Sequence, residues 1–283
     1  MFAAASFGQQ SFRDETGRWR RAHEEELKAD NGWLTVSGLF WLKPGVNTLG
    51  SGPDQNIILP ASAKATSVGT LELDQGVVTF RATYGVPVKV NGEPIREYEM
   101  KFDSEKPPQP FKVGALILSV IKRGDRFGLR VRDLNSRARS EFKGLRWFSP
   151  RESYKVVAEF IPYPEPKEII IMNVLGDELK MKTPGLLSFK LNGRKYQLRP
   201  VIEDDKLFII FRDRTAGKST YGAGRFLYAP MPKDGKVILD FNRAENPPCA
   251  FTPFATCPLP PPQNRLPIAI PAGELNTHQK AQR

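Results

Sequence analysis

The sequence predicts an all-β protein that begins with a single helix. Between Gly45 and Trp147, and again from Lys155 to Asn242, short runs of β-branched and aromatic residues alternate with polar ones, bounded by Gly, Pro, Asn or Asp. These runs recur about every 8–12 residues, which is typical of antiparallel sandwiches and barrels. The pattern breaks at residues 148–152, so we expect two β units.

The N-terminal helix is predicted over residues 11–30. The Asp-Asn-Gly at 30–32 is a stop signal. A sparse apolar stripe marks the side that we expect to be buried: Phe12, Trp19, Ala22 and Leu27. We therefore assign residues 1–32 to an N-terminal helix and tail.

The first β unit is predicted over residues 33–150. It opens with the aromatic stretch GWLTVSGLFWLKPG, which we expect to pack against the first sheet. Candidate strands follow at 46–49, 56–59, 69–74, 76–83, 86–90, 115–122, 126–132 and 140–148.

The second β unit is predicted over residues 151–283, as an antiparallel sandwich or barrel. Its candidate strands lie at 155–163, 168–174, 186–193, 196–203, 206–213, 224–230 and 236–242. Proline locks φ and removes a donor, so we expect the proline-rich coil of residues 247–273 to cross this unit along a fixed, irregular path.

The net charge of +11 points to an anionic partner such as a phosphate, a carboxylate or a nucleic acid. In a strand, every second side chain points to the same face. In RFGLRVRD this spacing puts three arginines on one strand face: Arg126, Arg130 and Arg132. This stripe is a candidate surface for a nucleic acid or another polyanion. The alternative is a solvent face kept soluble by its charge, and the lack of interleaved aromatic residues argues against nucleic acid.

The sequence gives no indication of a membrane partner. No apolar run approaches the roughly 20 residues that cross a bilayer. The start, MFAAASFGQQ, lacks the basic region of a signal peptide, so we expect a cytoplasmic protein. If this start is the remnant of a trimmed signal, the protein is instead exported.

Residues 47–60, NTLGSGPDQNIILP, resemble the opening of a forkhead-associated domain, and VKVNGEPI and LILSVIKR resemble its later strands. The matching positions are Thr48, Leu49, Gly50, Asn56, Ile57 and Leu59. The resemblance covers residues 45–135 and implies a forkhead-associated-like β-sandwich. That family binds phosphothreonine peptides with an arginine after the glycine, where this chain has Ser51. Because a phosphate dianion needs charge-assisted donors, we expect no phosphothreonine peptide as partner.

The whole chain also resembles a family of uncharacterised bacterial proteins, a domain of unknown function. The matching motifs span residues 32–274: GWLTVSGLFWLKPG, IKRGDRFGLRVRD, FRDRTAGKSTYGAGRFLYA, LDFNRAENPPCAFTPFATCPLP and NRLPIAIPAGE. The resemblance implies no reaction and no site residues.

Several chemistries are excluded by composition. The chain has two histidines, His23 in the predicted N-terminal helix and His278 in the last ten residues. We expect both to be exposed rather than to serve as the base of a serine or cysteine nucleophile. GKST at 217–220 lacks the first glycine of a phosphate-binding loop, because Arg212 occupies that position. We predict no metal site, and the residues name no cofactor.

The richest chemistry lies in the stretch from Tyr221 to Glu274. We expect a pocket for a small polar or anionic ligand, lined by Tyr221, Arg225, Asp240, Asn242 and Asn264. The alternatives are structural: loop asparagines satisfy backbone groups, and a buried Arg225 requires a partner such as Asp213 or Asp240. An enzyme using Asp240 or Glu274 as acid or base remains a further alternative.

The two cysteines, Cys249 and Cys257, lie within the proline-rich coil. In an exported protein they are candidates for a disulfide. In a cytosolic protein they are free thiols, which neighbouring arginines can make reactive. We favour a structural or disulfide role over catalysis.

Overall fold

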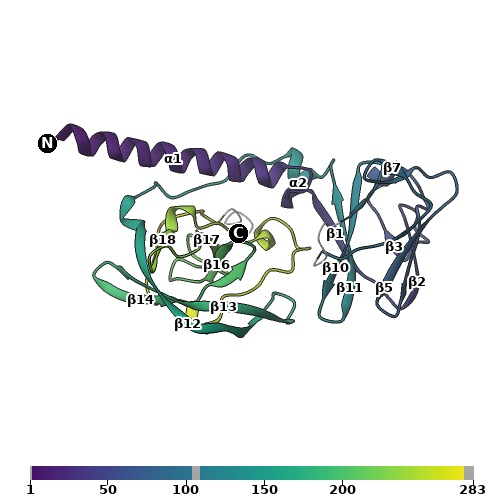
Figure 1. Ribbon diagram of the computed structural model, residues 1–283. Coiled ribbons are helices and arrows are strands. Elements are labelled where there is room, and N and C mark those ends of the chain that lie inside the picture. The colour runs from purple at the N-terminus through teal and green to yellow at the C-terminus, as the bar shows by residue number, and fades with distance from the viewer. Residues whose placement is uncertain (1, 104–108, 277–283) are drawn as a thin grey trace. The chain divides into compact units, whose positions relative to one another are not determined.

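Figure 1 shows the computed structural model, which describes residues 2–103 and 109–276. It is mostly β with one long N-terminal helix, as the sequence predicted. The chain forms two compact units: the sandwich unit, residues 26–142, and the C-terminal unit, which combines the described residues up to Glu25 with those from Lys143 onward. This division differs from the expected limits at 32 and 150, because the helix groups with the C-terminal unit.

The long helix, α1 (Phe2–Lys28), ends before the Asp-Asn-Gly stop signal. Its buried positions include Phe12 and Leu27, as predicted, but Ala22 is exposed. Polar side chains take part in the buried face instead, with Thr16 and His23 buried and Arg20 half-buried. Their spacing of three and four residues places them on one side of the helix.

Two sheets form the sandwich unit. The six-stranded sheet has the order β1 (Val36–Trp41), β11 (Arg126–Asp133), β10 (Leu116–Arg123), β9 (Phe111–Val113), β6 (Val88–Val90), β7 (Glu93–Pro94). The five-stranded sheet has the order β3 (Ile57–Ile58), β2 (Gly45–Gly50), β4 (Gly69–Asp74), β5 (Val77–Ala82), β8 (Glu97–Glu99). All pairs are antiparallel except β2 with β3, which confirms the expected sandwich.

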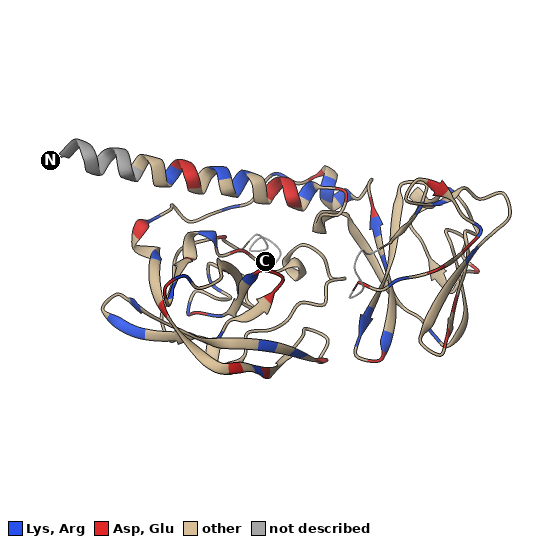
Figure 2. Cartoon of the chain, viewed as in Figure 1, with Lys and Arg blue, Asp and Glu red and all other residues tan. Residues whose placement is uncertain are grey.

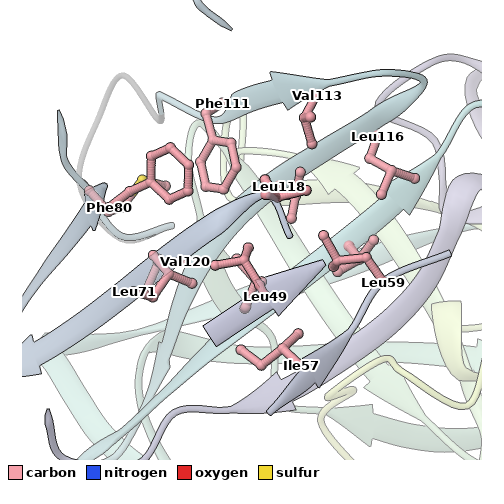
Figure 3. Close-up of a cluster of buried hydrophobic side chains, with 14 of the residues drawn as sticks. Leu49, Ile57, Leu59, Leu71, Phe80, Phe111, Val113, Leu116, Leu118 and Val120 are labelled. Atoms are coloured by element: carbon pink, nitrogen blue, oxygen red, sulfur yellow. The ribbon is translucent and has the colours of Figure 1, made fainter. Parts of the chain in front are cut away.

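The core of the sandwich unit lies between the inner faces of these sheets (Figure 3). Leu49, Leu71 and Phe80 come from one sheet, and Phe111 and Leu118 come from the other. The rings of Phe80 and Phe111 stack with their centroids 4.2 Å apart. Alternating inward residues of the two sheets thus interdigitate, as the period-two pattern requires.

Two predictions for this unit were wrong. The aromatic stretch after residue 33 was expected only to pack on the sheet, but it supplies the edge strand β1, paired with β11. Residues 140–148 were expected to form a strand, but a short helix, α2 (Arg137–Ser140), precedes irregular chain. The Ser136 hydroxyl caps α2 by accepting from the Arg139 amide at 3.3 Å.

The C-terminal unit contains a four-stranded and a three-stranded antiparallel sheet. The first has the order β14 (Arg194–Leu198), β13 (Glu178–Leu191), β12 (Lys155–Met172), β18 (Lys236–Asp240); the second has the order β15 (Val201–Glu203), β16 (Lys206–Phe211), β17 (Arg225–Pro230). Two predicted strands merge in β12, whose register shifts between Pro162 and Lys167. The prolines of PYPEP there cannot donate to the ladder.

Beyond β18 the chain crosses this unit without regular strands, as the prolines predicted. We call residues 241–276 the strap. It contains three 3₁₀ turns, Phe241–Arg243, Pro248–Ala250 and Pro262–Asn264. Isolated bridges fasten it at Phe226↔Glu245, Arg212↔Arg265, Asn173↔Pro258 and Trp147↔Glu274.

No helix in the described part of the chain is both long and apolar enough to cross a bilayer.

Candidate functional site

Two of the predicted ligand-binding residues, Asn242 and Asn264, form hydrogen bonds with backbone groups of the protein itself. Asn242 accepts from the Arg151 amide and donates to the Arg151 carbonyl, both at 2.9 Å. Asn264 makes the same pair of bonds to Arg199, at 2.7 and 2.9 Å, and also donates to the Ile210 carbonyl at 2.9 Å. Both amides are buried and fully engaged. The structure therefore uses them as backbone clamps.

Arg225, at the start of β17, is 2% exposed and forms a buried ion pair with Asp213. Its guanidinium also donates to the carbonyls of Ala272 and Ile270 in the strap. Asp213, one of the two partners expected, accepts in turn from the Thr215 amide at 2.6 Å. The hydrogen bonds of Arg225 thus tie the strap to the start of β17, and Asp213 neutralises the buried charge of its guanidinium.

Tyr221 lies apart from that ion pair. Its hydroxyl donates to the Cys249 carbonyl at 3.1 Å, and burial raises the pKa of the phenol. Of the five predicted ligand residues, only Asp240 and Asn242 meet directly, through Asn242 Nδ2 and Asp240 Oδ1 at 2.8 Å. Among the residues the structure describes, no hydrogen bond or ion pair joins Tyr221, Arg225 and Asn264 to one another or to that pair.

Asp240 instead belongs to a group of side chains that the sequence analysis did not bring together. We call it the α1 polar cluster: Arg20, His23, Trp147, Asp240, Arg243 and Asn246. Buried atoms of four of them lack a hydrogen-bond partner within the described chain: Arg20 Nε, His23 Nε2, Trp147 Nε1 and Asn246 Oδ1. The other two buried atoms, Asp240 Oδ2 and Arg243 Nε, face each other as an ion pair at 3.4 Å. All six residues belong to the C-terminal unit.

Aromatic contacts connect the cluster. The rings of Trp19 and His23 stack at a centroid separation of 5.4 Å, and both meet Trp147 edge-on, at 5.7 and 6.0 Å. The guanidinium of Arg20 lies 4.8 Å from the Trp147 ring centroid, and that of Arg243 lies 5.9 Å from the centroid of Trp19. These contacts join four members of the cluster to Trp19: Arg20, His23, Trp147 and Arg243.

Two segments of the strap position the cluster against residues 146–148. The Phe148 amide donates to the Gly273 carbonyl at 3.0 Å, and the Leu275 amide donates to the Arg146 carbonyl at 2.8 Å. The Glu274 amide reaches across to the Ala244 carbonyl, also at 2.8 Å. Gly273 has φ of +83°, and a Cβ there would lie 2.4 Å from the Ala244 carbonyl oxygen, so only glycine allows this approach.

His23 is neutral in this setting. Burial lowers its pKa to about 4, and Nδ1 lies 3.4 Å from Glu245 Oε2. Because the nitrogen that faces a carboxylate carries the proton, Nε2 is an acceptor. Beside the Asp240–Arg243 ion pair, the cluster therefore presents two donors, from Arg20 and Trp147, and two acceptors, from His23 and Asn246.

Glu274, one of the two predicted acid/base residues, is fully buried beside the cluster. Both carboxyl oxygens accept from Asn246, from its amide at 2.8 Å and from Nδ2 at 2.7 Å. Burial raises the pKa of Glu274 to about 8, against the opposing effects of these bonds and of the Arg225 charge. Asp240, the other predicted acid, forms an ion pair with Arg243 at 3.4 Å.

The arginine stripe of the sandwich unit packs on tryptophans. Arg126 lies over Trp41 at 4.3 Å, and Arg130 and Arg132 lie over Trp33 at 5.2 and 5.6 Å. Arg130 is buried, and Arg132 donates to the Gly32 carbonyl at 2.7 Å. Figure 2 shows Lys and Arg interspersed with Asp and Glu along α1 and spread over both units.

Within the described residues, no group of three or more His, Cys, Asp or Glu side chains is placed to hold a metal ion. Cys249 and Cys257 are not joined by a disulfide. His278 lies outside the described residues.

Three members of the cluster were not predicted as site residues: Arg20, His23 and Trp147. Arg243 and Asn246 stand in the polar stretch of residues 240–246 that the sequence pointed to. For the two on α1 the sequence carried a signal. Polar residues recur there every three or four positions on the same side as Phe12 and Trp19, which is unusual for a face that packs on a core. The residues of the strap carried no such signal, because the strap is irregular and its buried side chains do not recur at a fixed spacing.

Comparison with known proteins identifies the C-terminal unit. The family described as Protein of unknown function (DUF1684) matches residues 140–275. A solution structure of an uncharacterised protein of Haloarcula marismortui is 32% identical, over 50% of this chain and 80% of that one, with a TM-score of 0.42.

The chain belongs to the DUF1684 family.

The DUF1684 match contains the last three motifs of the sequence analysis, whereas the first two lie before it. Two structures of forkhead-associated domains are similar at 18% identity and a TM-score of 0.24, and each covers 33% of this chain. One comes from a study of phosphothreonine-dependent interactions and is covered to 92%; the other, covered to 97%, is complexed with an intracellular domain. The comparison with curated proteins gave no match.

Proposed function

We propose that the protein binds a small hydroxy-carboxylate at the α1 polar cluster. The observation that carries the proposal is the set of four buried, unpartnered hydrogen-bonding atoms on α1, at residue 147 and in the strap, together with the Asp240–Arg243 ion pair. An unsatisfied buried polar atom costs about 1–3 kcal/mol, so four such atoms in one unit call for partners. A bound ligand supplies those partners together.

The balance of donors and acceptors selects the class of ligand. Arg20 and Trp147 offer N–H groups, which suit a carboxylate. His23 Nε2 and Asn246 Oδ1 need donors, which hydroxyl groups provide. A sulfate dianion offers acceptors only and leaves both of these atoms without a donor. A molecule with one carboxylate and several hydroxyls matches both sides.

The tryptophans provide the test, because Trp19 and Trp147 border the cluster and Trp33 and Trp41 belong to the sandwich unit. We expect gluconate to shift the indole ¹⁵N–¹H resonances of Trp147 and Trp19 and to leave those of Trp33 and Trp41 in place. Acetate lacks the hydroxyls and sorbitol lacks the carboxylate, so both should bind more weakly. If gluconate shifts no indole resonance, or shifts all four equally, the proposal is wrong.

A variant tests the role of the unpartnered indole. Trp147→Phe removes one donor and keeps a ring in place, so we expect gluconate affinity, measured by calorimetry, to fall about tenfold, the equivalent of one lost hydrogen bond. Trp41→Phe in the sandwich unit is the matched control and should leave the affinity unchanged.

The raised pKa of Glu274 favours a second candidate function, an enzyme that uses this residue as a general acid. Glu274 retains its proton at neutral pH and contacts Asn246, a member of the cluster. We expect Glu274→Gln to leave gluconate binding intact, because the amide keeps its shape, and to abolish any turnover of the bound hydroxy acid. Loss of binding in this variant would instead assign Glu274 to the fold of the site.

A further inference from the structure

The two cysteines lie against each other in the strap. The Cys249 amide donates to Cys257 Sγ at 3.2 Å. The amide nitrogen is about 1.5 Å from its own Cα, so the Cys257 sulfur lies within reach of the Cys249 side chain by rotation about χ1. No disulfide joins them in this structure.

The surrounding chain holds both cysteines in place. The Tyr221 hydroxyl donates to the Cys249 carbonyl at 3.1 Å. On the other side, the Val174 amide donates to the Cys257 carbonyl at 2.9 Å, so the turn between β12 and β13 supports the second cysteine. Hydrogen bonds thus fix the backbone at each cysteine.

The two thiols differ in accessibility. Cys257 is 5% exposed, whereas Cys249 is half-buried. The Cys257 side chain, hydrogen-bonded to that of Cys249, lowers the pKa of the Cys249 thiol to about 7, despite partial burial. A substantial fraction of Cys249 is therefore thiolate near neutral pH, the form that attacks disulfides.

We propose that Cys249 and Cys257 form a thiol–disulfide exchange site that accepts small-molecule disulfides, independently of the α1 polar cluster. The Cys249 thiolate attacks one sulfur of the small disulfide, whose S–S bond breaks and releases one thiolate. The Cys257 thiol then gives up its proton, and its sulfur attacks the Cys249 sulfur of the mixed disulfide and expels the second thiolate. The protein loses two electrons and forms one S–S bond, and the small disulfide is reduced to two thiols.

Oxidised glutathione is the probe, applied to the folded full-length protein. Trypsin cleaves after Arg243 and Arg265, so one peptide, residues 244–265, carries both cysteines. We expect this peptide to become lighter by two hydrogen atoms and to lose both titratable thiols, and reduction by dithiothreitol to reverse the change. If both thiols remain reduced while the same protein reacts in urea, the proposal is overturned.

Two variants separate the roles of the cysteines. Cys257→Ser should stop at the mixed disulfide and carry glutathione on Cys249, because the resolving sulfur is missing. Cys249→Ser should react at about one tenth of the wild-type rate or below it, since the remaining thiol is buried. The reverse pattern, with rapid glutathionylation of Cys257, contradicts the assignment. A readout that does not depend on the Ser variants is alkylation of the wild type: iodoacetamide should label Cys249 before Cys257.

Discussion

Asparagine side chains bind both backbone groups of a single residue at three places in the described part of the chain. Asn47, Asn242 and Asn264 each bond to both the amide and the carbonyl of one residue, which is Lys43, Arg151 or Arg199 respectively. Each therefore acts as a short piece of β ladder where the chain is too irregular to form one.

Asn264→Ala should lower the free energy of unfolding of the C-terminal unit by about 2–4 kcal/mol, because it leaves the Arg199 amide and two carbonyls without partners. Urea denaturation followed by circular dichroism measures the loss. Gln197→Ala, at an exposed position of β14, is the control and should change stability by less than about 0.5 kcal/mol. Equal effects of the two variants would exclude the clamp.

His23 and Glu274 predict opposite pH dependences of stability. His23 has a folded pKa of about 4 against an ordinary 6.5, so its contribution is present above pH 6.5 and is lost as the pH falls to about 4. Glu274 has a folded pKa of about 8 against an ordinary 4.5, so its contribution is present below pH 4.5 and is lost as the pH rises to about 8. Between pH 4.5 and 6.5 the two contributions to stability change with pH in opposite directions.

Single variants should therefore reveal each slope. We expect His23→Gln to lose stability steadily from pH 4.5 to 8, and Glu274→Gln to lose it on acidification from pH 6.5 to 4. Each slope approaches about 1.4 kcal/mol per pH unit. Urea unfolding of the C-terminal unit at several pH values measures both, and identical profiles in the two variants would contradict the assigned pKa shifts.

At the scale of elements, the sequence predicted what its periods encode. Burial alternates along β4, β5 and the first half of β10, whereas β11 and β16 are buried at nearly every position. The strands β10, β11 and β16 lie close to their expected limits. The proline-rich strap also crosses its unit as expected. The edge strand β1 was missed because its aromatic residues do not alternate with polar ones, and the extended β12–β13 hairpin because Pro162 to Pro166 resembles a loop.

The candidate site was harder to predict than the fold. Asp240, Asn242 and Glu274 were found from residue type alone, but side-chain type does not distinguish a ligand contact from a backbone clamp. Arg20 and His23 lie more than two hundred residues before the strap, and without a shared period no local pattern connects the two segments. Only the packing of α1 brings them to one place.

For the whole molecule, the division into units predicts independent folding of the sandwich unit. Residues 26–142 contain both sheets of this unit and its complete core. We therefore expect a fragment of these residues to unfold cooperatively on heating, in the same way as this unit does within the full chain. Removing residues 1–25 should leave that transition in place and lower the transition of the C-terminal unit, which loses the contacts of α1 with Trp147 and Glu245. Calorimetry measures both, and an unfolded 26–142 fragment would refute the division.

The pairing of α1 with the strap has a consequence for how the chain is made. His23 leaves the ribosome more than two hundred residues before its partner Glu245. The sandwich unit can close during translation, once its own residues have emerged. The aromatic face of α1 stays uncovered until the strap has also been synthesised.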